Sequence, residues 1–189
     1  MSGAAAGIGH NRGPSMEGGA SWRQHCWGQA RAALLPHLPV EVLRGRLRRA
    51  EELGLDYRTY AGIRATTGHD VVAVLFSSNA LMALTGRTIP DSRRAKLATM
   101  TGCDRIGLAT RPITPASLLA MAGDVLDTTH PAPAALAPFA QARAALRAAL
   151  GRLPADRAIL IAAHGLESDW ANAARLAAAL PADRFFAPA

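Results

Sequence analysis

The chain has 189 residues, of which 50% are apolar and 5% aromatic, and a formal net charge of +7. This length suits one domain of ordinary size, and no apolar run approaches the roughly 18 residues that a membrane-spanning helix needs. The N-terminus lacks a basic region followed by an apolar one, so we predict no secretion signal, no membrane association and a cytoplasmic location. The isolated cysteines, Cys26 and Cys103, are then expected to be free thiols.

Arginine provides almost all of the positive charge, because Lys96 is the one lysine among 21 basic residues. Together with the many alanines, this bias is typical of a bacterial genome of skewed base composition. The charge is also spread out, with nine basic residues against five acidic ones in residues 1–64 and near balance in residues 65–129. Composition therefore gives nucleic-acid binding only weak support.

Residues 1–20 contain six of the 17 glycines and few apolar side chains. Such a stretch cannot bury enough apolar surface to fold, so we predict a flexible tail. The less repetitive segment Ile8–Pro14 is the part of it that could instead dock on a partner.

Residues 21–68 are expected to form a helical segment of three helices, because N-cap and terminating residues alternate at suitable spacing. We expect this segment to pack with the domain that follows as one unit. The start and stop signals are, in order, Ser21 and Pro36, Pro39 and Gly54, and Asp56 and Gly68.

Residues 69–189 change pattern and predict an α/β domain. The same order recurs along the chain: a residue that ends a helix, then an aspartate, then a short apolar run. This order is typical of a repeated helix-to-strand turn. We therefore expect a small three-layer, Rossmann-like α/β domain with about four mainly parallel strands, and with Asp70, Asp104, Asp156 and Asp183 at one edge of the sheet. The predicted strands are Val71–Phe76, Ile106–Ala109, Ala158–Ala163 and Arg184–Phe186.

Helices are expected between these strands. For the alanine-rich stretch 133–150, the prediction is based on helix propensity alone. Its expected inner face is Leu136, Phe139, Leu146 and Leu150. The predicted helices are 79–86, 91–101, 114–127, 133–150 and 168–180.

Polar side chains follow the first three predicted strands, and parallel strands would bring them to one edge of the sheet. Hydroxyls, an arginine and helix N-termini at such an edge favour a small anionic ligand, phosphorylated or nucleotide-like. The alternative is that the hydroxyls are ordinary helix caps. The candidate ligand-binding residues are Ser77, Ser78, Asn79, Thr110, Arg111 and Thr114.

The same edge offers a candidate for acid–base catalysis. His164 with Asp169 or Glu167 could serve as a base, and Ser78 as a nucleophile. However, no GxSxG motif surrounds Ser78, and a histidine after a strand is as often structural. The sequence leaves open whether the protein is an enzyme.

No cofactor or metal is expected. Neither GxGxxG nor GxxxxGK[ST] follows any predicted strand, which argues against a dinucleotide or a P-loop site. The six histidines are scattered and form no metal-binding spacing with cysteine.

Residues 42–67 support a second function class, because they match a helix-turn-helix weakly. Tyr57, Arg58 and Arg64 could then face nucleic acid, although Arg49 lies where such motifs usually have an apolar residue. A helical hairpin packed on the sheet explains the same pattern. A third class is a non-catalytic adaptor or interaction protein, and the oligomeric state is left open.

Overall fold

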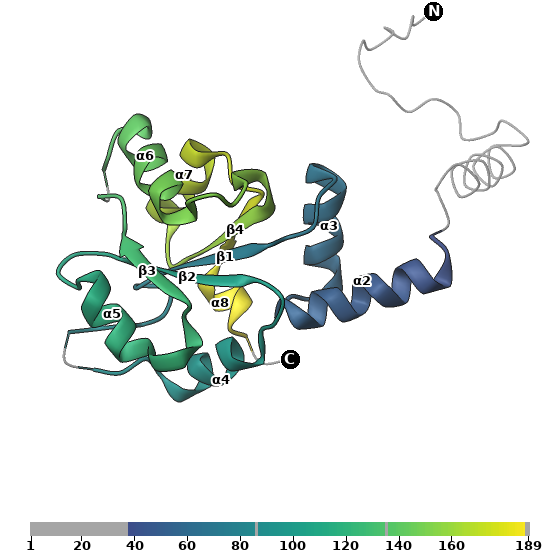
Figure 1. Cartoon of the computed structure of the whole chain (residues 1–189), viewed down its shortest axis with the longest axis horizontal. Coiled ribbons are helices and arrows are strands. Elements are labelled where there is room, and N and C mark those ends of the chain that lie inside the picture. The colour runs from purple at the N-terminus through teal and green to yellow at the C-terminus, as the bar shows by residue number, and fades with distance from the viewer. Residues whose placement is uncertain (1–37, 86, 135, 188–189) are drawn as a thin grey trace, which may run out of the picture. The chain divides into compact units, whose positions relative to one another are not determined.

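Five parallel strands in the order β3-β2-β1-β4-β5 form the middle layer of the computed structural model (Figure 1). The structure describes residues 38–187 apart from 86 and 135, and the described residues from 41 onward belong to one compact unit. The α/β fold with a parallel sheet and a preceding helical segment is confirmed. The predicted tail and the first predicted helix lie outside the described residues. The strands are β1 (Ala73–Ser77), β2 (Asp104–Ala109), β3 (Thr128–Pro131), β4 (Ala158–Ala162) and β5 (Ala178–Pro181).

Helices cover both faces of the sheet, and alternate residues of β1 show how the two faces differ. Val74 and Phe76 pack in a cluster with residues of α3, α4, α5 and α8, whereas Ala73 and Leu75 pack with α6 and α7. No described helix has the length and apolar character needed to cross a bilayer. The helices are α2 (Val40–Glu52), α3 (Tyr57–Thr67), α4 (Asp91–Thr99), α5 (Pro115–Ala122), α6 (Phe139–Leu150), α7 (Gly165–Ala174) and α8 (Ala182–Phe185), with 3₁₀ turns η1 (Gly123–Val125) and η2 (Ala155–Arg157).

The fourth predicted strand, Arg184–Phe186, is wrong in position. Pro181 ends β5, and the next residues form the short helix α8. This turn brings the Phe185 ring centroid to 5.7 Å from that of Phe76, and Phe186 to 6.4 Å. The two aromatic rings thus cover one face of β1 instead of extending the sheet.

The edge strands β3 and β5 were not predicted. Both are partly exposed, so neither carries the apolar run that marks a strand covered on both faces. Alanine-rich β5 was included in the helix predicted to Leu180, but α7 ends at Ala174, and its C-cap Arg175 has a left-handed φ of 59°. Because non-glycine residues rarely adopt a positive φ, the sequence does not indicate that the helix ends here.

Two predicted helices are also corrected. Residues 78–82 form a turn where the helix 79–86 was predicted: the Leu81 amide donates to Ser77 O at 3.0 Å, and Met82 has a φ of 53°. The helix predicted from residue 133 begins at Phe139, so Leu136 and Phe139 are exposed by 85% and 62% rather than buried. Leu146 and Leu150 do face the core.

The aspartates before the strands separate into two groups. Asp70, Asp104 and Asp156 lie at the amino edge, as expected, because β1, β2 and β4 are parallel and in register there. Asp183 follows β5 and therefore lies at the opposite edge, which corrects that prediction.

The α2–α3 pair packs on the sheet as a helical hairpin. Its buried residues belong to the same cluster as Val74 and Phe76 of β1. Asp56 caps α3 by accepting from the Thr59 amide at 2.9 Å, and Gly68 ends it in the left-handed conformation. The buried residues of the pair are Ala50, Leu53, Leu55, Tyr60 and Ile63.

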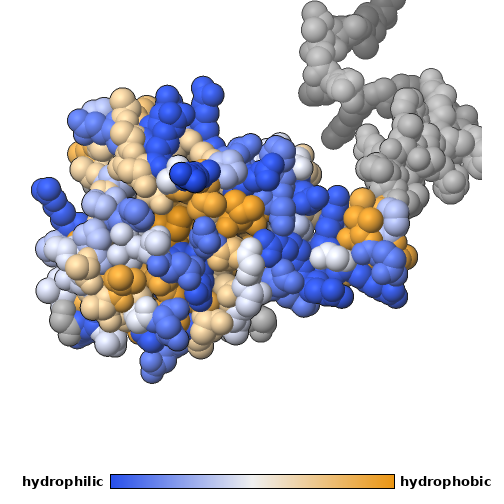
Figure 2. All heavy atoms as spheres, in the orientation of Figure 1, coloured by the Kyte–Doolittle hydropathy of each residue, from blue (hydrophilic) through white to orange (hydrophobic). Residues whose placement is uncertain are grey.

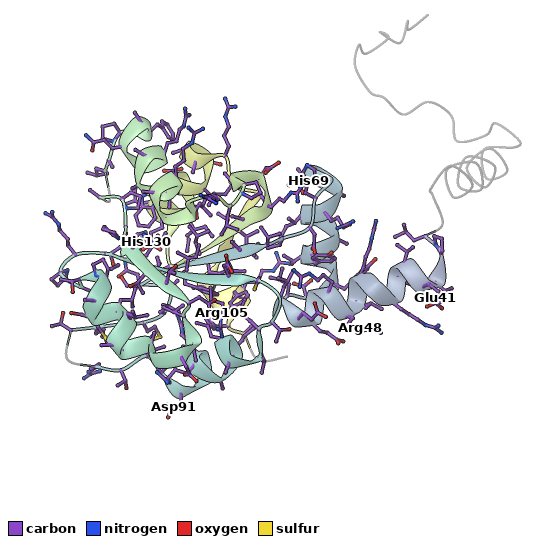
Figure 3. The ribbon with its side chains drawn as sticks, in the orientation of Figure 1. Glu41, Arg48, His69, Asp91, Arg105 and His130 are labelled. Atoms are coloured by element: carbon purple, nitrogen blue, oxygen red, sulfur yellow. The ribbon has the colours of Figure 1, made fainter. Side chains whose placement is uncertain are left out.

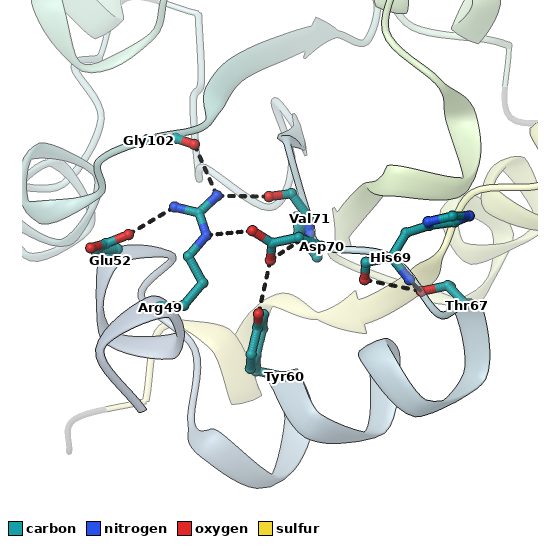
Figure 4. A network of polar contacts seen from close by, with 8 residues as sticks. All are labelled: Arg49, Glu52, Tyr60, Thr67, His69, Asp70, Val71 and Gly102. Carbon is teal, nitrogen blue, oxygen red and sulfur yellow. Dashed lines mark hydrogen bonds and ion pairs between the residues drawn. The ribbon is translucent and has the colours of Figure 1, made fainter. Parts of the chain in front are cut away.

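Arg49 connects this hairpin to the amino edge of the sheet (Figure 4). Its Nε donates to Asp70 Oδ2 at 2.9 Å, and its Nη2 donates to the carbonyl oxygens of Val71 and Gly102, both at 2.9 Å. Its Nη1 completes the set with Glu52 at 2.9 Å. One guanidinium thus joins α2, the start of β1 and the turn before β2.

The residues around Arg49 stabilise its positive charge. Burial alone would lower the pKa of its guanidinium, but the bonds to Glu52 and Asp70 outweigh burial and raise the pKa. Tyr60 Oη donates to the second oxygen of Asp70 at 2.9 Å. Gly102 is required at its position, because it has a φ of +65° and a Cβ there would lie 2.7 Å from Arg49 Nη1.

We predict that Arg49→Met lowers the free energy of unfolding by about 2–4 kcal/mol, because it leaves Asp70 and two carbonyl oxygens without their donor. Urea denaturation followed by circular dichroism measures the change. Arg48→Met is the matched control, since Arg48 is exposed on the outer face of α2 (Figure 3). Equal losses for the two variants would contradict the role assigned to Arg49.

A second ion pair attaches β3 to β2. Arg105 Nη2 lies 2.7 Å from Asp127 Oδ1, and the Arg105 amide donates to Asp127 Oδ2 at 2.7 Å. The side-chain hydrogen bond from Arg105 is the main reason that the pKa of Asp127 is lowered. The pKa of Asp127 is lower in the folded state than in the unfolded state. The ion pair therefore stabilises the protein fully when the pH is above the unfolded-state pKa. This stabilisation is lost as the pH falls through the folded-state pKa.

We therefore predict that Asp127→Asn lowers the free energy of unfolding at pH 7 by roughly 1 kcal/mol, a modest value because the Asp127 side chain is 41% exposed. The difference between variant and wild type should narrow below about pH 4. Denaturation measured across this range tests the prediction, with Asp124→Asn as control, because the Asp124 side chain is 94% exposed. A difference that does not depend on pH would contradict it.

Candidate functional site

The strand order locates the place where a site is expected. From β1 the chain crosses to β2 and β3 on one side, and then returns to β4 on the other side of β1. In open α/β sheets, ligands bind outside the carboxyl ends of the strands at such a reversal. Here the reversal lies between β1 and β4.

A cavity of about 1070 Å³, which we call the strand-exit cavity, opens at this edge. Its walls come from the loops that follow β1, β2, β3 and β4, and from the first turns of α5 and α7. Pockets for small ligands commonly have volumes of roughly 300–1,000 Å³. The lining residues are Asn79, Ala109, Thr110, Arg111, Pro112, Ile113, Thr114, Pro115, Pro131, Ala132, Pro133, Ala134, His164, Glu167 and Trp170.

Four of the six candidate ligand-binding residues line the strand-exit cavity, namely Asn79, Thr110, Arg111 and Thr114. The other two, Ser77 and Ser78, are fully buried beneath it. The Ser78 hydroxyl contacts the Thr110 hydroxyl and accepts from the Thr110 amide at 3.0 Å. The strand exits therefore converge, but the two serines support the loops from below.

Glu167 is the most unusual group at this edge, because its side chain is charged and has an exposure of 0%. Its Oε2 accepts from the Ser77 hydroxyl at 2.6 Å and from the Ala163 amide at 2.7 Å. Its Oε1 accepts from Asn79 Nδ2 at 2.8 Å. These donors offset the cost of removing a carboxylate from water, and they join the exits of β1 and β4.

The position of Glu167 in α7 explains why it reaches these partners. It lies in the first helical turn, three residues after the N-cap His164, where a glutamate can reach back to the amides before the helix. A carboxylate there also interacts favourably with the positive end of the helix dipole. The protein therefore already places a negative charge of its own at the α7 N-terminus.

The predicted catalytic residues do not come together. His164 lines the cavity, whereas Asp169 is exposed beside a different hollow and the Ser78 hydroxyl is engaged by Thr110. His164 Nε2 instead lies 3.6 Å from Glu167 Oε1, and its side chain is 49% exposed. Any acid–base chemistry at this edge would use His164 with Glu167 behind it.

Arg111 is the basic residue best placed to meet a ligand. It is exposed at the cavity, lies two residues after the end of β2 and is joined to Pro112 by a cis peptide bond. Within the described part of the chain it forms neither a hydrogen bond nor an ion pair. Beside it α5 begins, with Thr114 accepting from the Ser117 amide at 3.1 Å.

Metal and thiolate chemistry receive no support from the described residues. They contain no cluster of three or more histidine, cysteine, aspartate or glutamate side chains that could hold a metal ion. His69 precedes β1 and His130 lies in β3, and Figure 3 shows them well apart. Burial raises the pKa of the Cys103 thiol to about 11, so this thiol is protonated at pH 7.

The residues of the nucleic-acid alternative lie on α3, where Arg58 is exposed and Tyr57 and Arg64 are half-buried. Figure 2 shows α2 as mostly hydrophilic, with a hydrophobic N-terminal end. Charges of both signs occur on α2, and Arg44 Nη1 lies 2.7 Å from Glu41 Oε1. We find no feature on α2 or α3 that favours nucleic acid over water.

Two parts of the cavity wall were missed in the sequence. The loop Pro131–Ala134 follows β3, so it could be found only by recognising an edge strand in the polar stretch Thr128–Pro131. Trp170 was overlooked because α7 begins at Gly165, three residues before the predicted start at Ser168. The earlier start also places Glu167 inside the helix.

We predict that Glu167→Gln lowers the free energy of unfolding by about 2–3 kcal/mol, because an amide nitrogen would face donors that now have an acceptor. Asp169→Asn, an exposed change on the same helix, should alter it by less than about 0.5 kcal/mol. Urea denaturation compares the two. If both variants unfold like the wild type, Glu167 does not hold the two strand exits together.

Comparison of the chain with protein-family models, with curated proteins and with solved structures found no match. We therefore base the function on the strand-exit cavity and the residues that line it.

Proposed function

We propose that this protein binds a small anionic ligand in the strand-exit cavity. The observation that carries the proposal is that Asn79, Thr110, Arg111 and His164 come from three loops far apart in the sequence and line one cavity. A cavity at the reversal of strand order in a parallel sheet is the usual position for a ligand in this architecture.

The charges at the cavity favour an anion. Arg111 offers a guanidinium that no described residue engages, and a guanidinium binds phosphate or carboxylate in a bidentate manner. The carboxylate of Glu167 opposes an anion only weakly, because three donors surround it.

The anion is expected near Arg111 and the first turn of α5 rather than at α7. Glu167 already occupies the N-terminus of α7, whereas Thr114 and Pro115, at the start of α5, line the cavity. In the first turn of α5, Pro115 has no N–H and the Ser117 amide donates to Thr114, so the Ala116 amide and the helix dipole are what this turn offers to an anion. Thr110 and Asn79 also line the cavity, where the Thr110 hydroxyl contacts the Ser78 hydroxyl and Asn79 Nδ2 donates to Glu167 Oε1.

We propose binding rather than nucleophilic catalysis. Both serines at the exit of β1 are fully buried with their hydroxyls engaged, so neither is free to attack a ligand.

A thermal-shift screen of phosphate, nucleotides, sugar phosphates and acyl phosphates tests the proposal. A ligand present at a hundred times its dissociation constant adds about 2.7 kcal/mol to the free energy of unfolding. For a chain of this length each kcal/mol raises the Tm by roughly 2–4 °C, so the shift should be readily measured.

Arg111→Ala should weaken binding of any such ligand by about tenfold or more, because it removes a charge-assisted hydrogen bond. Arg152→Ala is the matched control, since Arg152 is an exposed arginine in the turn between α6 and η2, at the amino edge of the sheet. A ligand whose affinity is unaffected by Arg111→Ala would show that the anion binds elsewhere.

A further inference from the structure

A second, smaller hollow of about 280 Å³ lies beside the strand-exit cavity. We call it the apolar groove, and its main lining residues are Leu136, Phe139, Leu166 and Trp170. Leu136 belongs to the loop after β3, Phe139 begins α6, and the other two lie on α7. The groove therefore belongs to the same edge of the sheet as the cavity.

The side chains of the groove are unusually exposed for their size. Leu136 is 85% exposed, Phe139 62% and Leu166 47%. Single apolar residues on a surface need no explanation, but several that share one hollow mark a place where an apolar group binds. The structure leaves this apolar surface facing water.

Trp170 makes the cavity and the groove continuous, because it lines both. Its side chain is 4% exposed, and its Nε1 is buried with no acceptor among the described residues. A buried N–H without an acceptor is unfavourable and uncommon in folded proteins. The two hollows thus share one buried aromatic side chain as part of their walls.

We infer that the ligand is amphiphilic, with an anionic group at Arg111 and an alkyl or acyl chain in the apolar groove. This inference rests on the proposed function and names the class of ligand. Charge sets the orientation, because Asp169 lines the groove and repels an anionic group from that end. The apolar groove is joined to the cavity through Trp170, so the hydrocarbon chain and the anionic group can belong to one small molecule.

The test uses the full-length chain and measures dissociation constants for methyl, butyl and hexyl phosphate by calorimetry. Each buried methylene should strengthen binding by about fourfold, so hexyl phosphate, which has five more methylenes than methyl phosphate, should bind up to roughly a thousand times more tightly. Arg111→Ala should weaken binding of all three.

The double variant Leu136→Ala/Phe139→Ala should abolish the dependence on chain length and leave the affinity for methyl phosphate unchanged. Both side chains are exposed, so the fold should tolerate the change. Met82→Ala/Leu119→Ala is the matched control, because these residues are 52% and 41% exposed and line neither hollow.

Three outcomes would overturn the inference, and they can be told apart. Equal affinity for the three phosphates, with methyl phosphate still sensitive to Arg111→Ala, would overturn the amphiphilic ligand and keep the anion site. Absence of binding by all three would overturn the proposed function as well. A concentration-dependent dimer that the Leu136→Ala/Phe139→Ala variant abolishes, seen by sedimentation, would assign the groove to a second copy of the chain.

Discussion

A buried carboxylate holds the two strand exits on which the candidate site is built. Removing a carboxylate from water costs several kcal/mol unless donors inside the protein replace the water. For Glu167 these donors come from the exits of β1 and β4, two neighbouring strands that are far apart in the sequence. The need to satisfy one charge therefore fixes the separation of the loops beneath the cavity.

The amino edge of the same sheet depends on a charge of the opposite sign. Arg49 brings a guanidinium, and the amino edge supplies acceptors from Asp70, Val71 and Gly102. Thus β1 is held at its start by a cation and at its exit by an anion. The two edges differ in what they offer a ligand. At the amino edge, the donors of Arg49 are bonded within the protein. At the carboxyl edge, Arg111 has no partner among the described residues.

How much the sequence predicts depends on burial. Strands β1, β2 and β4 were predicted because their residues are buried on both faces, and such strands are continuous apolar runs. Strands β3 and β5 lie at the sheet edges, where partial exposure removes that signal. For β5 the alanines favoured a helix, and only pairing with β4 makes them a strand.

The same reasoning applies to the site. The convergence of Thr110, Arg111 and His164 follows from parallel strands, so it could be predicted without knowing the strand order. The burial of Ser77 and Ser78 could not, because the depth at which a chain leaves a sheet depends on the turn that follows. Here that turn is held by the Ala80 amide donating to Ser77 Oγ at 2.9 Å.

The dimensions of the cavity bear on what its ligand must be. A phosphate or carboxylate group beside Arg111 fills only a small part of about 1070 Å³, and one charged contact worth about tenfold in affinity does not by itself give tight binding. A ligand gains more by also contacting the apolar part of the cavity wall, to which Pro131, Ala132, Pro133 and Trp170 belong. That wall is apolar and continues into the groove, so the part of the ligand that adds most to affinity is expected to be hydrocarbon, while the anion mainly sets its orientation.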